Sequence, residues 1–340
     1  FFGAGRLQVN ETNFTTSFTA INYTQGVDDR RAEGKLTYAL NPKNTLKLSY
    51  LWKNLKTTND SYPSPSSIMD LASLFDDQVP ESLLAANYQR VLSSNLFVEG
   101  QYSSRTKDTQ NYGSQTMDLV RGTPIWDRSR SNARFSAATY CAVCPNYVNL
   151  LNNWDTYGKV NYYLSTKSAG THNLVGGFDV FKDMRKNNQN DTASGYRIRA
   201  TGTQIVGQNV YPIFRTGTST FIDWRPVFLD TLGSDLRTYS GFVNDVWRLN
   251  QRFTVNLGVR YDRNQTKNQG GRLVGDAGSW SPRVGATWDI AQDGRWISTA
   301  SFGHYVGTFM TQVADAASPA GRSSSFSWFY QGPSINDSAT

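Results

Sequence analysis

The sequence Arg252-Phe-Thr-Val-Asn-Leu-Gly-Val-Arg-Tyr-Asp262 is the stretch that decides the fold class. Apolar and polar side chains alternate along all 11 residues, which is the two-residue period of a β-strand with two unlike faces. The apolar face carries Phe253, Val255, Leu257, Val259 and Tyr261. A strand of this length tilted by about 45° rises roughly 26 Å, close to the ~25 Å apolar band of a membrane-spanning β-barrel. We therefore expect this face to contact lipid.

The same alternation recurs in five hairpins along the chain, at residues 32–53, 83–104, 156–182, 238–262 and 280–305. Residues 1–31 add an entering strand whose alternation is looser. Links of two to seven residues join the strands within each hairpin, whereas links of 29, 51, 55 and 17 residues join one hairpin to the next. This regular change from short to long links is typical of outer-membrane barrels, which have short periplasmic turns and long extracellular loops.

The long links show little regular structure in their sequence. The sequence allows a short helix over residues 68–75, and residues 105–155 and 183–237 are interpreted as loops. Within the first of these, Trp126-Asp-Arg-Ser-Arg130 combines an aromatic ring with cations, which suits ligand binding, but a solvated loop is the favoured interpretation. Residues 306–340 are polar and Ser-rich, and they end without a closing strand.

The composition narrows the class of protein. No run approaches the ~18 consecutive apolar residues of a membrane helix, which excludes a helical membrane protein. Only 38% of the residues are hydrophobic, yet the chain has 18 Tyr, 18 Phe and 9 Trp, as expected where apolar residues alternate with polar ones. The net charge of +7 is spread along the chain and forms no concentrated basic face, so no nucleic-acid partner is expected.

These observations predict an all-β fold, an antiparallel transmembrane β-barrel in which residues 1–340 form a single partial barrel domain. In hydrocarbon every backbone donor and acceptor needs an internal partner, so strands can span only as a closed barrel. The chain supplies ten clear strands and an eleventh with looser alternation. With polar residues on the inner face, such a wall should surround water or a plug.

Three runs resemble the barrel of TonB-dependent outer-membrane receptors. They are Tyr239-Ser-Gly-Phe-Val-Asn-Asp-Val-Trp247, Asn256-Leu-Gly-Val-Arg-Tyr-Asp262 and Trp280-Ser-Pro-Arg-Val-Gly-Ala286. The sequence looks most like the Oar-like group, which carries an N-terminal carboxypeptidase-regulatory-like domain. The specific resemblance covers residues 238–307, and the pattern of hairpins extends it over most of the chain.

The resemblance implies a barrel of about 22 strands, filled by a plug domain and opened by energy that the TonB complex delivers. By this resemblance the chain is roughly half of such a barrel, and the plug and the C-terminal strands lie outside it. The implied location is the outer membrane of a Gram-negative bacterium, and the implied partners are outer-membrane lipid, the plug, TonB and an unknown extracellular ligand. The implied function is ligand capture by the long loops and active uptake, without cofactor or enzymatic chemistry.

Cys141-Ala-Val-Cys144 is the most specific chemical motif in the sequence. A redox CxxC requires a helix N-terminus that lowers the thiol pKa, and the flanking residues instead favour a loop. A zinc site would need two more ligands, and no second CxxC exists. The favoured interpretation is a small structural disulfide in an exported loop, with catalytic, free or metal-binding thiols as the alternatives.

Charged residues on the polar strand face are the other candidates, namely Arg260, Asp262, Arg283 and Asp289. Buried charges need partners, so we expect these lumen-facing residues to pair across strands. They could contact a plug or simply line a wet interior, and the sequence does not choose between the two. The histidines, His172 and His304, belong to no HExxH or triad-like set. No catalytic, metal or cofactor-binding residue is predicted.

Two other functions fit the same pattern. A passive structural or adhesive barrel would use its loops to bind a surface or a partner, and it would have no plug. A secreted all-β binding protein would pack its apolar strand faces inward against each other. The three hypotheses differ in where the apolar face lies and in what is encoded beside this chain.

Overall fold

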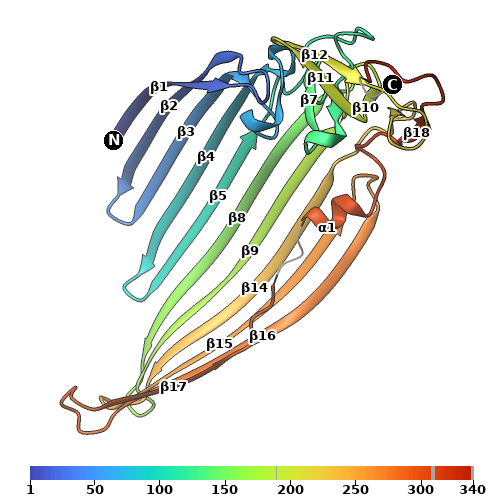
Figure 1. The fold of residues 1–340 in the computed structure, drawn as a ribbon. Helices are drawn as coiled ribbons and strands as arrows, with labels where there is room; N and C mark the ends of the chain where they lie inside the picture. The colour runs from blue at the N-terminus through green and yellow to red at the C-terminus, as the bar shows by residue number, and fades with distance from the viewer. Residues whose placement is uncertain (189, 308–310, 338–340) are drawn as a thin grey trace.

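The computed structural model describes residues 1–188, 190–307 and 311–337, and its main feature is one large, curved antiparallel sheet (Figure 1). Each strand pairs with its neighbours in the order β1-β2-β3-β4-β5-β8-β9-β14-β15-β16-β17. The bounds are β1 Phe2–Thr15, β2 Asn22–Asn41, β3 Asn44–Asp60, β4 Phe75–Ser93, β5 Leu96–Lys107, β8 Val148–Ser165, β9 Thr171–Asn188, β14 Ser234–Arg248, β15 Phe253–Lys267, β16 Leu273–Asp289 and β17 Ile297–Gly303. The order follows the chain, which makes the sheet a simple meander.

The sheet is a curved wall rather than a closed barrel, because β1 and β17 lie at its two edges. The long loops gather at one end of the wall, at the top of Figure 1, and the short hairpin turns lie at the other. We call these the loop end and the turn end. The predicted all-β antiparallel architecture, its five hairpins and the segregation of short and long connections are confirmed.

The strands are longer than the sequence pattern predicted. β3 continues to Asp60, β8 begins at Val148 and β15 continues to Lys267, each several residues into a predicted loop. Ladder pairing holds these extensions in register, as between Val148 and Asn188. The extensions show no regular apolar alternation: residues 263–267 are all polar, and in β8 the apolar Leu150 and Leu151 are adjacent. Hydrophobic periodicity marks only the part of a strand that has one apolar environment.

The apolar face of the wall is exposed, as a lipid-contacting surface should be. In β15, Leu257 lies opposite Val284 of β16, which in turn lies opposite Phe302 of β17. All three side chains are exposed, as is Trp280, at 63%. The inward packing that a soluble all-β protein would need is therefore absent from these described strands.

Asp245 is a charged residue on this apolar face, close to the turn end. Its Oδ2 lies 2.7 Å from Nδ1 of His172 on the neighbouring strand β9. The imidazole ring also stacks on Trp247, with ring centroids 5.2 Å apart. The pair gives one oxygen of a carboxylate on the lipid-facing side a hydrogen-bond partner, and it gives His172 a structural role.

The loop end carries further structure that the sequence pattern did not predict. Within the described residues, seven short strands fold there: β6 Ile125–Asp127, β7 Ala133–Phe135, β10 Tyr196–Ala200, β11 Gly202–Val206, β12 Asn209–Ile213, β13 Phe221–Trp224 and β18 Phe326–Phe329. The helix allowed near residues 68–75 is a single 3₁₀ turn at Leu71–Ser73, where Asp70 accepts a hydrogen bond from the Ser73 backbone. A short helix, α1 (Thr311–Ala316), follows the wall. Among the described residues, no helix is both long and apolar enough to cross a membrane.

Candidate functional site

The loops at the loop end fold together into one structure, which we call the cap: residues 61–74, 108–147, 190–233 and 317–337. Its centre is a five-stranded sheet in the order β18-β13-β10-β6-β7. β6 and β10 pair in parallel, while the other neighbours are antiparallel. Since these strands come from two of the long connections and from the segment that follows β17, the sheet joins them into a single body above the wall (Figure 1).

The two faces of the cap sheet differ in chemistry. On one face, Phe135 packs in an apolar cluster with Met69 and Ala133. The β11–β12 hairpin covers this cluster with Ile205 and Val210. The cap therefore has a small hydrophobic core of its own, which is what distinguishes a folded unit from a set of solvated loops.

The opposite face collects arginines around a single indole ring. The guanidinium carbons of Arg197, Arg199 and Arg134 lie 4.1, 4.7 and 4.9 Å from the centroid of the Trp126 ring. Arg199 also pairs with Asp223 at 3.0 Å. Burial lowers the pKa of Arg197 to about 10, with the nearby Arg225 acting in the same direction. Cation–π contact with Trp126 offsets part of the cost of burying this charge.

Asp127 is a fully buried carboxylate that joins three parts of the cap. Its Oδ1 accepts hydrogen bonds from the backbone N–H and hydroxyl of Ser129, at 2.8 and 2.6 Å. Its Oδ2 accepts from Arg130 at 2.9 Å and from the hydroxyl of Thr203, in β11, at 2.5 Å. Burial raises the pKa of Asp127, but these hydrogen bonds outweigh burial and leave the pKa below its usual value of 3.8. The solvated loop expected at residues 126–130 is therefore wrong, because Trp126 and Asp127 are enclosed by strands from distant parts of the chain.

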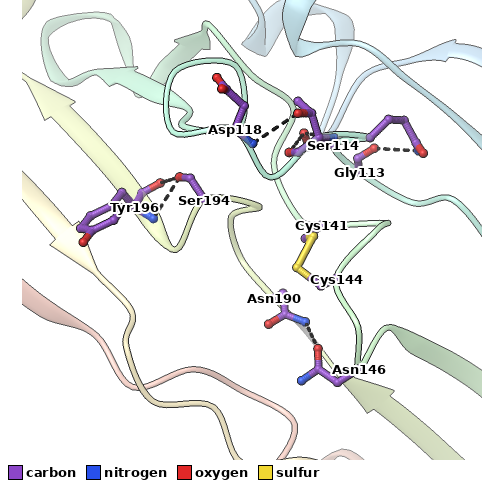
Figure 2. The surroundings of a disulfide bond; sticks show 11 residues. Gly113, Ser114, Asp118, Cys141, Cys144, Asn146, Asn190, Ser194 and Tyr196 are labelled. Atoms are coloured by element: carbon purple, nitrogen blue, oxygen red, sulfur yellow. Dashed lines mark hydrogen bonds between the residues drawn. A yellow bond between two sulfur atoms is a disulfide. The ribbon is translucent and has the colours of Figure 1, made fainter.

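Cys141 and Cys144 form a disulfide in the structure, with their Cα atoms 5.6 Å apart (Figure 2). The Ala142 backbone N–H donates to Ser114 of the same loop at 3.0 Å, and the Tyr140 N–H donates to Asp191 of the loop between β9 and β14 at 3.1 Å. Asn190 also donates to the side chain of Asn146 at 2.9 Å (Figure 2). The disulfide therefore lies where two loops are joined, and its place indicates a structural role.

Tyrosines surround this junction. The ring of Tyr140 lies 5.0 Å from Tyr62 and 5.5 Å from Tyr112. The Tyr147 hydroxyl donates to the carbonyl of Thr109 at 2.6 Å, and burial raises the pKa of Tyr147 to about 12. These aromatic contacts pack the loop between β3 and β4 against the loop that carries the disulfide.

Arg260 and Asp262, two of the predicted lumen-facing charges, lie together on the polar face of the wall. Arg260 Nε donates to Asp262 at 2.8 Å, and its Nη2 lies 3.4 Å from Asp179 of β9. Ser240 of β14 links the group, since it accepts from Arg260 at 2.7 Å and donates to Asp262 at 2.5 Å. The resulting network crosses three neighbouring strands.

The other two predicted charges have no acid or base as partner in the described residues. The Arg283 guanidinium lies 4.7 Å from the centroid of the Tyr305 ring. Asp289 accepts backbone hydrogen bonds from Gln292 at 2.9 Å and Gly294 at 3.1 Å. Asp289 therefore shapes the last hairpin turn, and the structure does not bring these two residues to the Arg260 network.

No cluster of potential metal ligands occurs in the described part of the chain. His304 lies near a backbone oxygen, that of Trp280, at 2.9 Å. The residues of the cap that sequence reasoning missed are Arg134, Arg197 and Arg199. Their loop sequences carry no periodic signal, and only the pairing of β6, β7 and β10 brings them to one ring.

A family model described as an outer membrane beta barrel domain matches residues 6–275. The chain belongs to this family. Its members are placed in the outer membrane by their description, and the outer membrane is accordingly the location of this barrel.

Among characterised proteins, the TonB-dependent transporter Oar of Myxococcus xanthus is 28% identical over 177 residues. The match includes 50% of this chain and 16% of the transporter, so the chain spans about a sixth of this curated relative.

Solved structures of outer-membrane transporters show the same fold. The outer membrane transporter YddB from Escherichia coli has a TM-score of 0.54 at 12% identity, covering 90% of this chain and 36% of that one. FpvA of P. aeruginosa, in a complex with a heterologous pyoverdine, has a TM-score of 0.50 at 11% identity, covering 88% of this chain and 40% of that one. The barrel domain of this chain therefore resembles those of TonB-dependent receptors. This resemblance supports a receptor or transporter as the general class of protein.

Proposed function

We propose that this chain is the barrel segment of a TonB-energised uptake receptor, and that its cap captures an extracellular ligand. The observation that carries the proposal is the cap itself. Its sheet combines strands from two long connections and from the segment after β17, and the cap has its own apolar core and buried hydrogen-bond network. A loop end that only had to close a hairpin would need a few residues. Loops held in place by a rigid scaffold commonly carry binding residues, and a folded cap at the loop end suits capture of an extracellular ligand.

The proposed arrangement treats residues 1–340 as one partial barrel domain, completed by further strands and by a plug from the same protein. The Arg260 network on the polar face then borders the interior. The resemblance to the Oar transporter supports this arrangement, although the match extends over only part of that protein. No covalent chemistry is proposed for the chain, since its relatives are transporters and receptors.

The energised step is tested by site-specific photocrosslinking in living cells. The full-length protein carries a photoreactive residue at successive positions of its periplasmic segments, and crosslinks to TonB are scored with and without a protonophore. Active uptake predicts a crosslink whose yield changes when the proton gradient is removed. The absence of any TonB crosslink at every position, with the protein correctly inserted, would support a passive or adhesive barrel instead.

A further inference from the structure

A cavity of about 330 Å³ lies in the cap, beside the apolar core on the same face of its sheet. Ile198, Ile222 and Trp328 occupy one cross-strand row of the sheet and line the cavity. Ile198 is the register partner of Ile125, which packs on the core that the β11–β12 hairpin covers. The apolar face is thus covered over β6 and β7 and open over β10, β13 and β18.

Aromatic rings form most of the cavity wall. Phe214 and Tyr330, both in the lining, lie 5.6 Å apart at their ring centroids. Phe221 and Phe329 also border the cavity, but they follow Arg199 in the cross-strand row of the opposite face, where their ring centroids lie 5.7 Å apart. Trp328, in the row of Ile198 and Ile222, contributes a further ring and is 61% exposed. Rings held this way present flat apolar surface at low conformational cost, and transfer of that surface from water to a ligand is favourable.

The polar atoms of the lining are few and are mostly engaged. Thr220 Oγ1 accepts from the backbone of Arg215 at 2.9 Å and shares a hydrogen bond of 2.7 Å with Thr201. The Tyr330 hydroxyl donates to the carbonyl of Pro333 at 2.8 Å. Gln331 supplies the remaining amide, and none of the described lining residues is charged. A charged group placed here would lose its hydration without gaining a partner.

We propose that this cavity binds an uncharged, ring-bearing group of the ligand that the cap captures. The proposal rests on the proposed function, because it assigns the place and the chemical class of that capture. A volume near the lower end of the ~300–1,000 Å³ of ligand pockets fits one ring system rather than a whole large ligand. The arginine face lies on the other side of the sheet, where the guanidinium carbons of Arg128 and Arg199 lie 5.3 and 5.6 Å from the centroid of the Phe221 ring.

The test is saturable photolabelling of the full-length protein in outer-membrane vesicles. The probe is 3-trifluoromethyl-3-phenyldiazirine, which is neutral and aromatic, and labelled peptides are mapped by mass spectrometry. We expect labels within residues 214–222 and 328–331 that saturate with probe concentration, whereas labels on the lipid-facing strands rise in proportion to it. A carboxylate-bearing form of the same probe should label these two segments at least tenfold less.

Two variants on the same strand give a matched comparison. Trp328 and Phe326 lie on the same face of β18 and are both exposed, at 61% and 50%, but only Trp328 lines the cavity. Trp328→Ala should raise the half-saturating probe concentration about tenfold, and Phe326→Ala should leave it unchanged. Equal effects of the two variants, or labelling that never saturates, would overturn the proposal.

The result also separates the pocket from the proposed transport function. Saturable labelling without any TonB crosslink would uphold the ring-binding cavity and reject energised uptake. A TonB crosslink with only non-saturable labelling would reject the cavity and leave energised uptake standing.

Discussion

Substitution of Asp127 should loosen the cap while the membrane wall stays intact. The carboxylate is fully buried and accepts hydrogen bonds from Ser129, Arg130 and Thr203. Asp127→Ala removes all of these acceptors and leaves the Arg130 cation without its 2.9 Å partner. Breaking a buried ion pair by removing one member costs about 3–5 kcal/mol. The lost free energy belongs to the cap alone, because the wall is held by separate ladders.

The assay is native-state hydrogen exchange on the protein in lipid vesicles. A loss of about 3–5 kcal/mol accelerates exchange through cap opening by roughly two to three and a half orders of magnitude. We expect this faster exchange at amides of β6, β10 and β11, and we expect the exchange rates of β15 amides to stay unchanged. Asp118→Asn is the control in the same cap, since Asp118 is exposed and lies 3.8 Å from Arg121; it should change exchange by less than about fivefold. Unchanged cap amides in Asp127→Ala, or equal acceleration in β15, would refute the reasoning.

The pH dependence of a second substitution at this position, Asp127→Asn, checks the sign of the electrostatic contribution. The folded-state pKa of Asp127 lies below 3.8, so its ionised form is favoured by folding. Its contribution is therefore fully present above pH 3.8 and is lost as the pH falls through the lower folded pKa. The difference in cap stability between the wild type and Asp127→Asn should be constant at neutral pH and shrink only below about pH 3.8.

Three further outcomes are expected. Replacing both Cys141 and Cys144 with serine should lower the local stability of the cap by about 2 kcal/mol, because the disulfide closes only a short loop. Hydrogen exchange of amides in residues 111–147 measures this loss, and intact-mass analysis after alkylation shows whether the wild-type disulfide is formed. His172→Leu leaves Asp245 unpaired near lipid and should destabilise the barrel by about 1–3 kcal/mol in urea unfolding from vesicles, whereas His172→Leu with Asp245→Val should recover most of the loss. Arg260→Met should cost about 1 kcal/mol, since the side chain is only partly buried, and a cycle with Asp262→Asn should show coupling; additive effects would argue against the network.

The sequence by itself determined the wall. Alternation in Arg252–Asp262 and in the five hairpins is a local property, because each side chain's face follows from its position in the strand. Turn lengths are also local, and they place the long loops at one end. The first strand, with its loose alternation, and the strand extensions at the loop end were predicted less well, because neither shows a regular two-residue period.

Only the tertiary structure decided the cap. Ser327 donates to Asp223, 104 residues away, and Arg215 pairs with Asp337, 122 residues away. The Arg197 and Trp126 side chains meet because β6 and β10 pair in parallel across two different loops. Such contacts depend on which loops the wall brings together, and short strands of three to five residues carry too few positions to show a period. Local sequence therefore determines the membrane-spanning strands, whereas the candidate binding site arises from contacts between segments that are distant in the chain.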